Sequence, residues 1–360
     1  MRQLIFIFIL LVSVYFPAQS KGYPHPGGMH PEEQIIFVKK MIDKKAQPYL
    51  EAYHQLILKA DSTLDKELHV LADFKVPGFY QDAAGHRRNS SGFQSDAFGA
   101  YACALAWQLS GDRKYAERSL HILMEWGRQN KTYSDYDGPL VMAYSGTAMV
   151  MAGELMYNYP GWKTADRDVY FGWVSNVYRR ACNEIRNRTN NWADWGRFGS
   201  ALCAYLLDDE EEMKENIRLV RSDLFHKIAP DGHMPEETRR EANGIWYTYF
   251  SLAPITAACN VIRNATGEDI FILEEEGRSI RNALDYLYHY NQHPEQWTWF
   301  KNPRPGSPQS WPGNLFEAMG PVYDETKYSA YVEGVRPLVY ERHHFAWSFP
   351  TLMPPVFDKK

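Results

Sequence analysis

The chain has 360 residues, with 39 Lys or Arg against 44 Asp or Glu, which gives a formal net charge of −5 at neutral pH. Hydrophobic residues make up 45% and charged residues 23%, a balance typical of a globular protein and not of a disordered one. Aromatic residues reach 15% without any basic excess. This argues against a nucleic-acid partner, because phosphates require a cationic surface. It suits a carbohydrate ligand or a core rich in aromatic residues.

The N-terminus has the pattern of a secretory signal peptide. Arg2 precedes an apolar run over residues 4–16, and Ala18-Gln19-Ser20 follows it with the small residues of a cleavage site. The run is too short for a membrane span, which needs roughly 20 apolar residues. We therefore predict a signal peptide over residues 1–20 and an exported single domain over residues 21–360, periplasmic or secreted, without a membrane span.

Three segments share one helical plan: residues 95–126, 199–228 and 251–288. In each, apolar residues recur with helical spacing, a short polar turn (SGD, LDD or TGED) interrupts them, and the helical pattern then restarts. Such units are αα-hairpins, and their unequal spacing favours a toroid over a regular repeat array. We predict an all-α fold, an incomplete (α/α) toroid or barrel of antiparallel helix hairpins.

A stretch rich in proline and glycine, residues 303–321, is predicted to be a long loop, of the kind that is often functional in compact domains.

The four cysteines lie in helical patterns without any metal-binding spacing. Export permits disulfides, but buried free thiols are the expectation. No metal and no cofactor are predicted. The adjacent His343 and His344 would point apart and share no metal.

Arg240 and Tyr247 are the first candidate pair for chemistry. If residues 239–252 form a helix, two turns place both side chains on one face. A neighbouring guanidinium lowers the pKa of a phenol, and it also binds a planar carboxylate through two parallel hydrogen bonds. The pair could therefore hold a uronic acid and remove its proton. A buried tyrosine beside an exposed arginine is the alternative.

Asn190 and Asn191 form an amide pair where a helix is expected to begin. An asparagine amide donates hydrogen bonds without carrying charge, and so it could stabilise the negative charge that develops when an α-proton leaves a carboxylate. The alternative is a helix cap, a position that asparagine prefers.

The stretch DGHMPEETRREANGIWYTYFSLAP, residues 231–254, resembles the most distinctive segment of the alginate lyase family, polysaccharide lyase family 5 and its relatives. Upstream, Asn190, Asn191 and Trp195 match the family pattern Asn-Asn-His-x-x-Trp. The segment 95–126 is also similar to the wider group. The resemblance implies a partial α/α toroid, in agreement with the hairpins, and a polysaccharide lyase acting by β-elimination.

By this resemblance, Asn191 and Arg240 would neutralise the substrate carboxylate, and Tyr247 would abstract the C5 proton, donate to the leaving O4, or both. The family histidine is replaced by Trp192, whose indole cannot take a proton. Either one tyrosine serves as base and acid in a syn elimination on D-uronates, with the indole stacking on a sugar ring, or another histidine substitutes. His86 is the first candidate for that histidine.

Further substrate contacts are expected from Asn190, Trp192, Tyr80 and Arg239.

Two alternatives to the lyase function stay open. An α/α-toroid glycosidase could use two carboxylates, for which Asp135 and Asp137 are candidates, although Asp-x-Asp-Gly is also a turn pattern. A non-catalytic protein that binds uronate glycans is the other. The expected partner is an anionic polysaccharide, and a monomer is expected.

Overall fold

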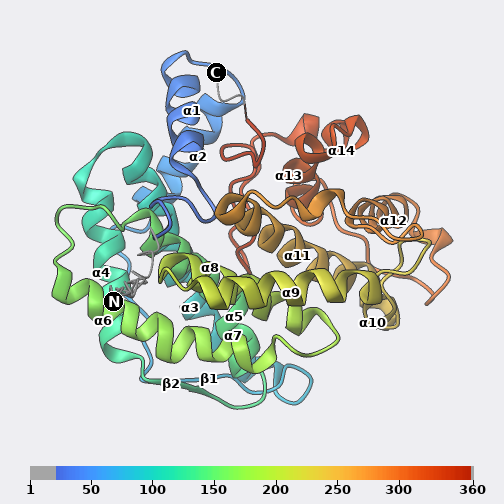
Figure 1. Cartoon of the computed structure of the whole chain (residues 1–360), viewed down its shortest axis with the longest axis horizontal. Helices are drawn as coiled ribbons and strands as arrows, with labels where there is room; N and C mark the ends of the chain where they lie inside the picture. The colour runs from blue at the N-terminus through green and yellow to red at the C-terminus, as the bar shows by residue number, and fades with distance from the viewer. Residues whose placement is uncertain (1–21, 358–360) are drawn as a thin grey trace, which may run out of the picture.

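The computed structural model describes residues 22–357, which form a largely helical molecule (Figure 1). The predicted signal peptide lies outside the described residues. The helical segments, in chain order, are α1 (Glu32–Asp43), α2 (Tyr49–Asp61), α3 (Ala83–Ser110), α4 (Arg113–Gln129), α5 (Gly138–Leu155), α6 (Thr164–Trp173), the π-helix η1 (Val174–Tyr178), α7 (Arg179–Ile185), α8 (Asn191–Leu206), α9 (Glu210–Lys227), α10 (Pro235–Thr238), the 3-10 helix η2 (Glu241–Asn243), α11 (Gly244–Thr266), η3 (Ile270–Ile272), α12 (Ile280–Gln292), η4 (Pro294–Gln296), α13 (Gly313–Tyr323), α14 (Thr326–Val332) and η5 (Glu333–Val335).

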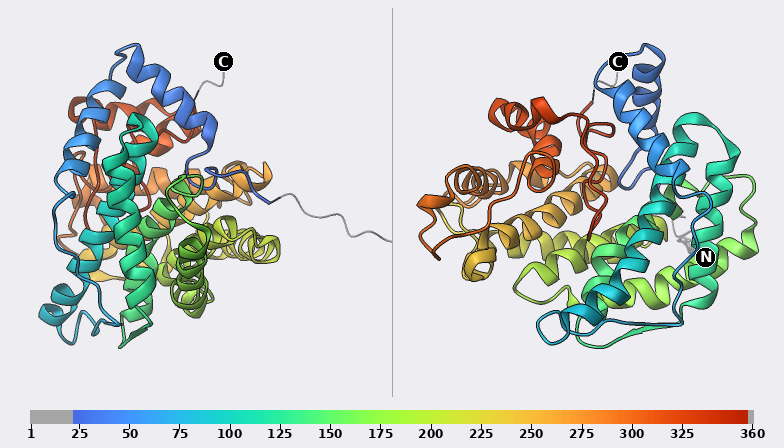
Figure 2. Two further views of the ribbon diagram at one scale, coloured as in Figure 1. Left: turned by 90° about the vertical axis from the view of Figure 1, so that its left-hand side faces the viewer. Right: turned by 180° about the vertical axis from the view of Figure 1, so that it is seen from behind.

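Four long helices, α3, α5, α8 and α11, form the inside of the molecule. Each packs on the next in this order, and the helices that follow them in the chain cover their outer side. Every residue of α5 and of α8 is buried. Helices that are buried all round belong to a core, whereas α4 and α12 have one apolar face each and lie outside. Figure 2 shows the same helices from the side and from behind.

The predicted hairpins are confirmed: α3 with α4, α8 with α9, and α11 with α12. Gly111 ends α3 and Gly267 ends α11, with φ of 74° and 78°, a left-handed backbone that glycine adopts without steric cost. Asp209 caps α9 by accepting a hydrogen bond from the backbone N–H of Glu212. The polar turns seen in the sequence are therefore the points where one helix is capped and the next begins.

The prediction that residues 303–321 form a loop is wrong in its second half. Helix α13 begins at Gly313, and Leu315, Phe316 and Met319 are buried along it. Pro321 lies in the last turn of the helix. The density of proline and glycine concealed this apolar spacing.

Two short strands, β1 (Asp73–Lys75) and β2 (Thr132–Ser134), pair in parallel at the lower edge of Figure 1. With three residues each they are too short to give a period-2 signal, and the sequence analysis did not identify them. Their importance is positional, since the chain after each strand runs into the cavity described below.

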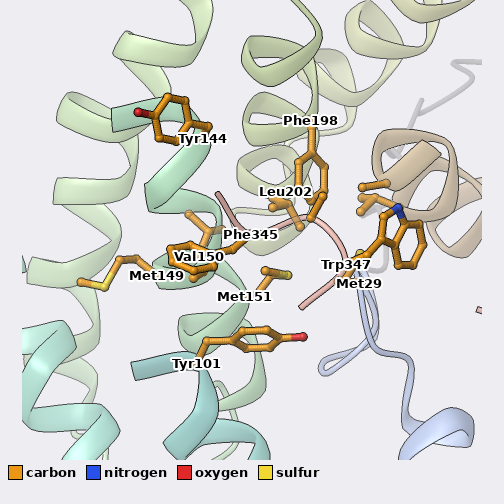
Figure 3. Packing of buried hydrophobic residues seen from close by; sticks show 14 of the residues in the cluster. Met29, Tyr101, Tyr144, Met149, Val150, Met151, Phe198, Leu202, Phe345 and Trp347 are labelled. Atoms are coloured by element: carbon orange, nitrogen blue, oxygen red, sulfur yellow. The ribbon is translucent and has the colours of Figure 1, made fainter. Parts of the chain in front are cut away.

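The core is continuous from the N-terminal segment to the C-terminal one. The C-terminal segment enters between the inner helices, where the Phe345 carbonyl accepts a hydrogen bond from the Thr147 hydroxyl at 2.9 Å. All four cysteines are buried free thiols. Within residues 22–357, no helix is long and apolar enough to cross a membrane. Figure 3 labels some of the buried side chains: Met29, Tyr101, Tyr144, Met149, Val150, Met151, Phe198, Leu202, Phe345 and Trp347.

Candidate active site

A cavity of about 570 Å³ brings together most of the residues that the sequence analysis placed at a site. Arg239 is the exception, since its side chain is 64% exposed and pairs with Glu236 one turn away. Arg239 follows the end of the short helix α10, and its side chain lies outside the cavity. The predicted residues that line the cavity are Tyr80, His86, Asn190, Asn191, Trp192, Arg240 and Tyr247.

The cavity lies where all four inner helices begin. His86 lies in the first turn of α3, Asp137 precedes α5, Asn190 precedes α8 and Asn243 precedes α11, and all four residues line the cavity. The N-terminus of a helix carries unpaired N–H groups and a partial positive charge. Four such ends around one cavity create an environment that favours an anion.

Arg240 and Tyr247 meet in this cavity, but they do not share a helix. The chain makes a 3-10 turn, η2, between Arg240 and the start of α11, so the condition of one helix over residues 239–252 is not met, although residues 244–252 are helical. The guanidinium carbon of Arg240 nevertheless lies 4.4 Å from the centre of the Tyr247 ring. The Tyr247 hydroxyl is also 3.0 Å from the hydroxyl of Tyr80, which follows β1.

The expected lowering of the Tyr247 pKa does not occur. Burial raises the pKa of Tyr247 to about 12, and the hydrogen bond with Tyr80 acts in the same direction. Arg240 opposes both effects, as predicted for a positive neighbour, but burial is the larger effect. At neutral pH the phenol therefore keeps its proton.

The two asparagines have different surroundings. Asn190 is the cap of α8, since its side-chain oxygen accepts a hydrogen bond from the backbone N–H of Trp192 at 3.2 Å. Asn191 is buried, and both its backbone N–H and its side-chain Nδ2 donate to the carboxylate of Glu237, each at 2.7 Å. Glu237 belongs to the quoted family-like stretch, yet the sequence analysis gave it no role.

Trp192 lies at the cavity wall with its ring covered by an arginine. The guanidinium carbon of Arg188 lies 3.8 Å from the centre of the indole ring, which is a close cation–π contact. The Tyr136 ring approaches the indole edge-on at 5.8 Å. The predicted stacking of Trp192 on a sugar ring stays a prediction, and one face of the indole already carries Arg188.

His86 faces a carboxylate. Its Nε2 lies 3.4 Å from Oδ2 of Asp137, which also accepts a hydrogen bond from the backbone N–H of Phe79 at 2.8 Å. Burial lowers the pKa of His86 and raises the pKa of Asp137. Asp135 does not line the cavity, and its carboxylate accepts from the backbone N–H of Tyr136 instead. The glycosidase alternative required Asp135 and Asp137 together, and only Asp137 lines the cavity.

The sequence analysis missed two further lining residues, Arg304 and His343. Arg304 comes from the loop before α13, and its backbone N–H donates to the carbonyl of Ala242 at 2.9 Å. His343 stacks on Tyr144 with the ring centres 4.5 Å apart, whereas His344 packs into the aromatic core. Arg304 lies in the stretch 303–321 that was predicted to be a functional loop, but no residue of that loop was named. Nothing in the local sequence around His343 indicates the cavity, because it reaches the cavity through long-range packing.

The cavity wall is cationic although the whole chain is anionic. Among its lining residues are three arginines and a single carboxylate, that of Asp137. Three guanidinium groups and four helix N-termini match a ligand that carries carboxylates, since a guanidinium binds a planar carboxylate through two hydrogen bonds.

Comparison with known proteins identifies the family. The model of the family described as alginate lyase matches residues 40–297, well over half of the chain. The sequence matches no curated protein significantly.

Solved structures share the fold at low sequence identity. An alginate lyase from Bacteroides ovatus is 21% identical, with a TM-score of 0.70 over 87% of this chain and 96% of that one. Alginate lyase A1-III from Sphingomonas species A1 is 15% identical, with a TM-score of 0.66 over 92% and 99%. A variant of A1-III complexed with tetrasaccharide gives a TM-score of 0.67 at 14% identity, over 84% and 92%. The predicted toroid of helix hairpins is thereby confirmed, and the chain belongs to the alginate lyase family of polysaccharide lyases.

Proposed function

We propose that this protein cleaves a uronic-acid polymer by β-elimination in the cavity at the N-terminal ends of the inner helices. The observation that carries the proposal is the meeting of the Tyr247 phenol and the Arg240 guanidinium in one cationic cavity. A carboxylate of the substrate supplies the negative charge that this cavity lacks. The relatives described as alginate lyases, one of them complexed with a tetrasaccharide, support a uronate polymer such as alginate as the substrate.

Arg240 and Asn191 neutralise the carboxylate of the bound uronate, which acidifies the proton on C5. The oxygen of Tyr247 takes this proton while the phenol proton passes to O4 of the leaving sugar. The C4–O4 bond breaks and a C4=C5 double bond forms, so that Tyr247 ends with one proton, as it began. Because Tyr247 is protonated at neutral pH, it supplies the acid for O4, and its oxygen becomes basic enough to take the C5 proton only as its own proton leaves.

A single residue can play both parts only when the C5 proton and O4 lie on the same face of the sugar. D-mannuronate and D-glucuronate have this geometry, and L-guluronate does not. Trp192, at the position of the family histidine, supports a preference for D-uronates, since the indole offers no proton acceptor. His86, paired with Asp137, is the candidate second base if L-guluronate is cleaved as well.

A panel of polyuronates tests the proposal directly. The product of β-elimination carries a double bond conjugated to the carboxylate and absorbs ultraviolet light. We expect new absorbance with polymannuronate or glucuronan, and less with polyguluronate. New reducing ends without absorbance would point to a hydrolase, and affinity without either signal would point to a glycan-binding protein.

The proposal includes export of the protein, which rests on the pattern of residues 1–20. Expression of the full chain in a bacterial host, followed by N-terminal sequencing of the product from the periplasm, tests this. A mature chain that begins at Lys21 is expected, and an uncleaved cytoplasmic product would contradict it.

A further inference from the structure

Glu237 holds Asn191 by two hydrogen bonds that leave the asparagine little choice of orientation. Oε1 of Glu237 accepts from the backbone N–H of Asn191 and Oε2 accepts from Nδ2, both at 2.7 Å. Glu237 and Asn191 are each 1% exposed. The side-chain oxygen of Asn191 is buried and has no hydrogen-bond partner. With both nitrogens turned to Glu237, this oxygen is the polar atom of the Asn191 side chain that has no partner.

This orientation has the wrong polarity for a carboxylate ligand. An amide oxygen only accepts hydrogen bonds, and a carboxylate oxygen only accepts them too. The nitrogen that could donate to the ligand is committed to the carboxylate of Glu237. Asn191 can offer a donor to a uronate only if its amide turns over, and the amide oxygen would then need a donor from Glu237.

Glu237 also lines a second cavity of about 200 Å³, separate in its lining from the cavity that Asn191 lines. Glu237 thus lies between the two cavities, bonded to Asn191 on one side and lining the second cavity on the other. Burial raises the pKa of Glu237 to about 7. The charged and titratable groups around it are Asp194 on α8, Asp223, His226 and Lys227 on α9, and Glu236 on α10; Arg197 on α8 lies behind them, against the two aspartates.

Burial favours the protonated state of Glu237, and the nearby charges act in both directions: Lys227 lowers its pKa and Asp194 raises it. Lys227 donates to Asp194 at 2.6 Å and lies 3.5 Å from Asp223, and Arg197 pairs with both aspartates. Both cations are therefore engaged by the two aspartates, and no salt bridge from either cation reaches Glu237 in the described residues. The buried Glu237 carboxylate is held by Asn191 instead.

We propose that Glu237 is a positioning residue whose proton sets the orientation of the Asn191 amide, so that Asn191 offers a donor to the substrate carboxylate only when Glu237 is protonated. With the proton in place, the carboxyl donates to the Asn191 side-chain oxygen, still accepts from the backbone N–H, and frees Nδ2. This inference rests on the proposed function. It predicts that binding of a uronate takes up a proton from solution at neutral pH.

The first experiment measures this proton directly. A mannuronate oligosaccharide is titrated into the Tyr247→Phe variant, which is expected not to cleave it, by calorimetry at pH 7 in two buffers with different ionisation enthalpies. We expect an uptake of about half a proton per site, because a group with a pKa near 7 is about half protonated before binding. An uptake of zero would overturn the inference.

Glu237→Gln supplies the matched variant, since a glutamine amide mimics the protonated carboxyl. Its nitrogen donates to the Asn191 side-chain oxygen, and its oxygen still accepts from the backbone N–H. In the wild type, KM should rise up to about tenfold per pH unit above pH 7, and in Glu237→Gln it should stay flat. Glu236→Gln is the control, because this neighbour contacts Arg239 and not Asn191, and it should keep the wild-type dependence.

The outcomes separate this inference from the proposed function. If the wild type neither binds nor cleaves any polyuronate, the proposed function fails. If it cleaves one and the KM of Glu237→Gln rises with pH as in the wild type, the function stands and the positioning role of Glu237 fails. Thermal unfolding of Glu237→Gln checks that this variant is folded. If it is not folded, the proton uptake measured with Tyr247→Phe tests the positioning role of Glu237 on its own.

Discussion

Replacing Tyr247 by phenylalanine removes one oxygen atom from the cavity and leaves the ring in place. The Tyr247 hydroxyl is 3.0 Å from the hydroxyl of Tyr80, and the Tyr80 side chain is 74% exposed, so water can replace the lost partner. The Arg240 guanidinium still lies over the ring. A hydrogen bond of this kind contributes about 0.5–1.5 kcal/mol, and we expect the unfolding free energy to change by no more than that.

The effect on catalysis should be far larger. Acid and base catalysis by a positioned side chain each contribute about 10²- to 10⁴-fold. Because Tyr247 is proposed to serve in both roles, we expect kcat to fall by at least about 10³-fold, which corresponds to roughly 4 kcal/mol in the barrier. The assay follows the ultraviolet absorbance of the unsaturated product from polymannuronate.

Tyr80→Phe is the matched control, since it breaks the same hydrogen bond from the other side. Its kcat should fall less than about tenfold, because Tyr80 takes no proton in the proposed reaction and acts on Tyr247 through this hydrogen bond; a loss of a substrate contact at Tyr80 would appear in KM. A Tyr247→Phe variant that is folded and keeps more than a few per cent of wild-type kcat would refute the assignment of Tyr247 to the proton transfer.

Three further predictions follow from contacts described above or from buried packing. Arg240→Lys keeps the charge but loses the paired hydrogen bonds, and kcat/KM on polymannuronate should fall about 10- to 100-fold; an unchanged value would exclude Arg240 from carboxylate binding. Gly196→Ala places a methyl group 2.6 Å from the Cys182 carbonyl and should cost about 1–3 kcal/mol in urea unfolding, whereas Gly172→Ala, in open space, should not destabilise; equal effects would contradict this packing. Burial lowers the pKa of His344 well below 6.5, so below pH 6.5 the unfolded chain binds a proton at His344 that the folded chain does not, and the folded state loses stability as the pH falls. His344→Phe should therefore flatten the fall of Tm in acid, and an unchanged slope would contradict this reasoning.

The helix hairpins could be predicted because their signals are local. Apolar spacing, a capping aspartate and a left-handed glycine all lie within a few residues of each helix end, as at Gly111 and Asp209. Helix α13 was missed because the proline and glycine residues that precede it are a strong local signal for a loop, whereas its own apolar spacing is a weaker signal for a helix.

The residues of the candidate site also differ in whether a local sequence signal indicates them. Asn191, Arg240 and Tyr247 could be found from one resemblance, because they lie in two short motifs. His343 reaches the cavity from a distant part of the chain and no local pattern indicates it, whereas the loop that carries Arg304 was indicated only by its proline and glycine content and not by the residue itself. The pKa of Tyr247 was misjudged because a neighbouring charge can be inferred from spacing, whereas the depth of burial depends on the whole fold.

The convergence of four helix starts on one cavity has a consequence for how this enzyme can evolve. The attraction that peptide dipoles exert on an anion belongs to the main chain, so no side-chain replacement can remove it. A descendant that lost Arg188 or Arg304 would still attract anionic ligands to the same place, with salt weakening the attraction. Side chains at the rim are then free to change which polymer is accepted, while the general preference for anions persists.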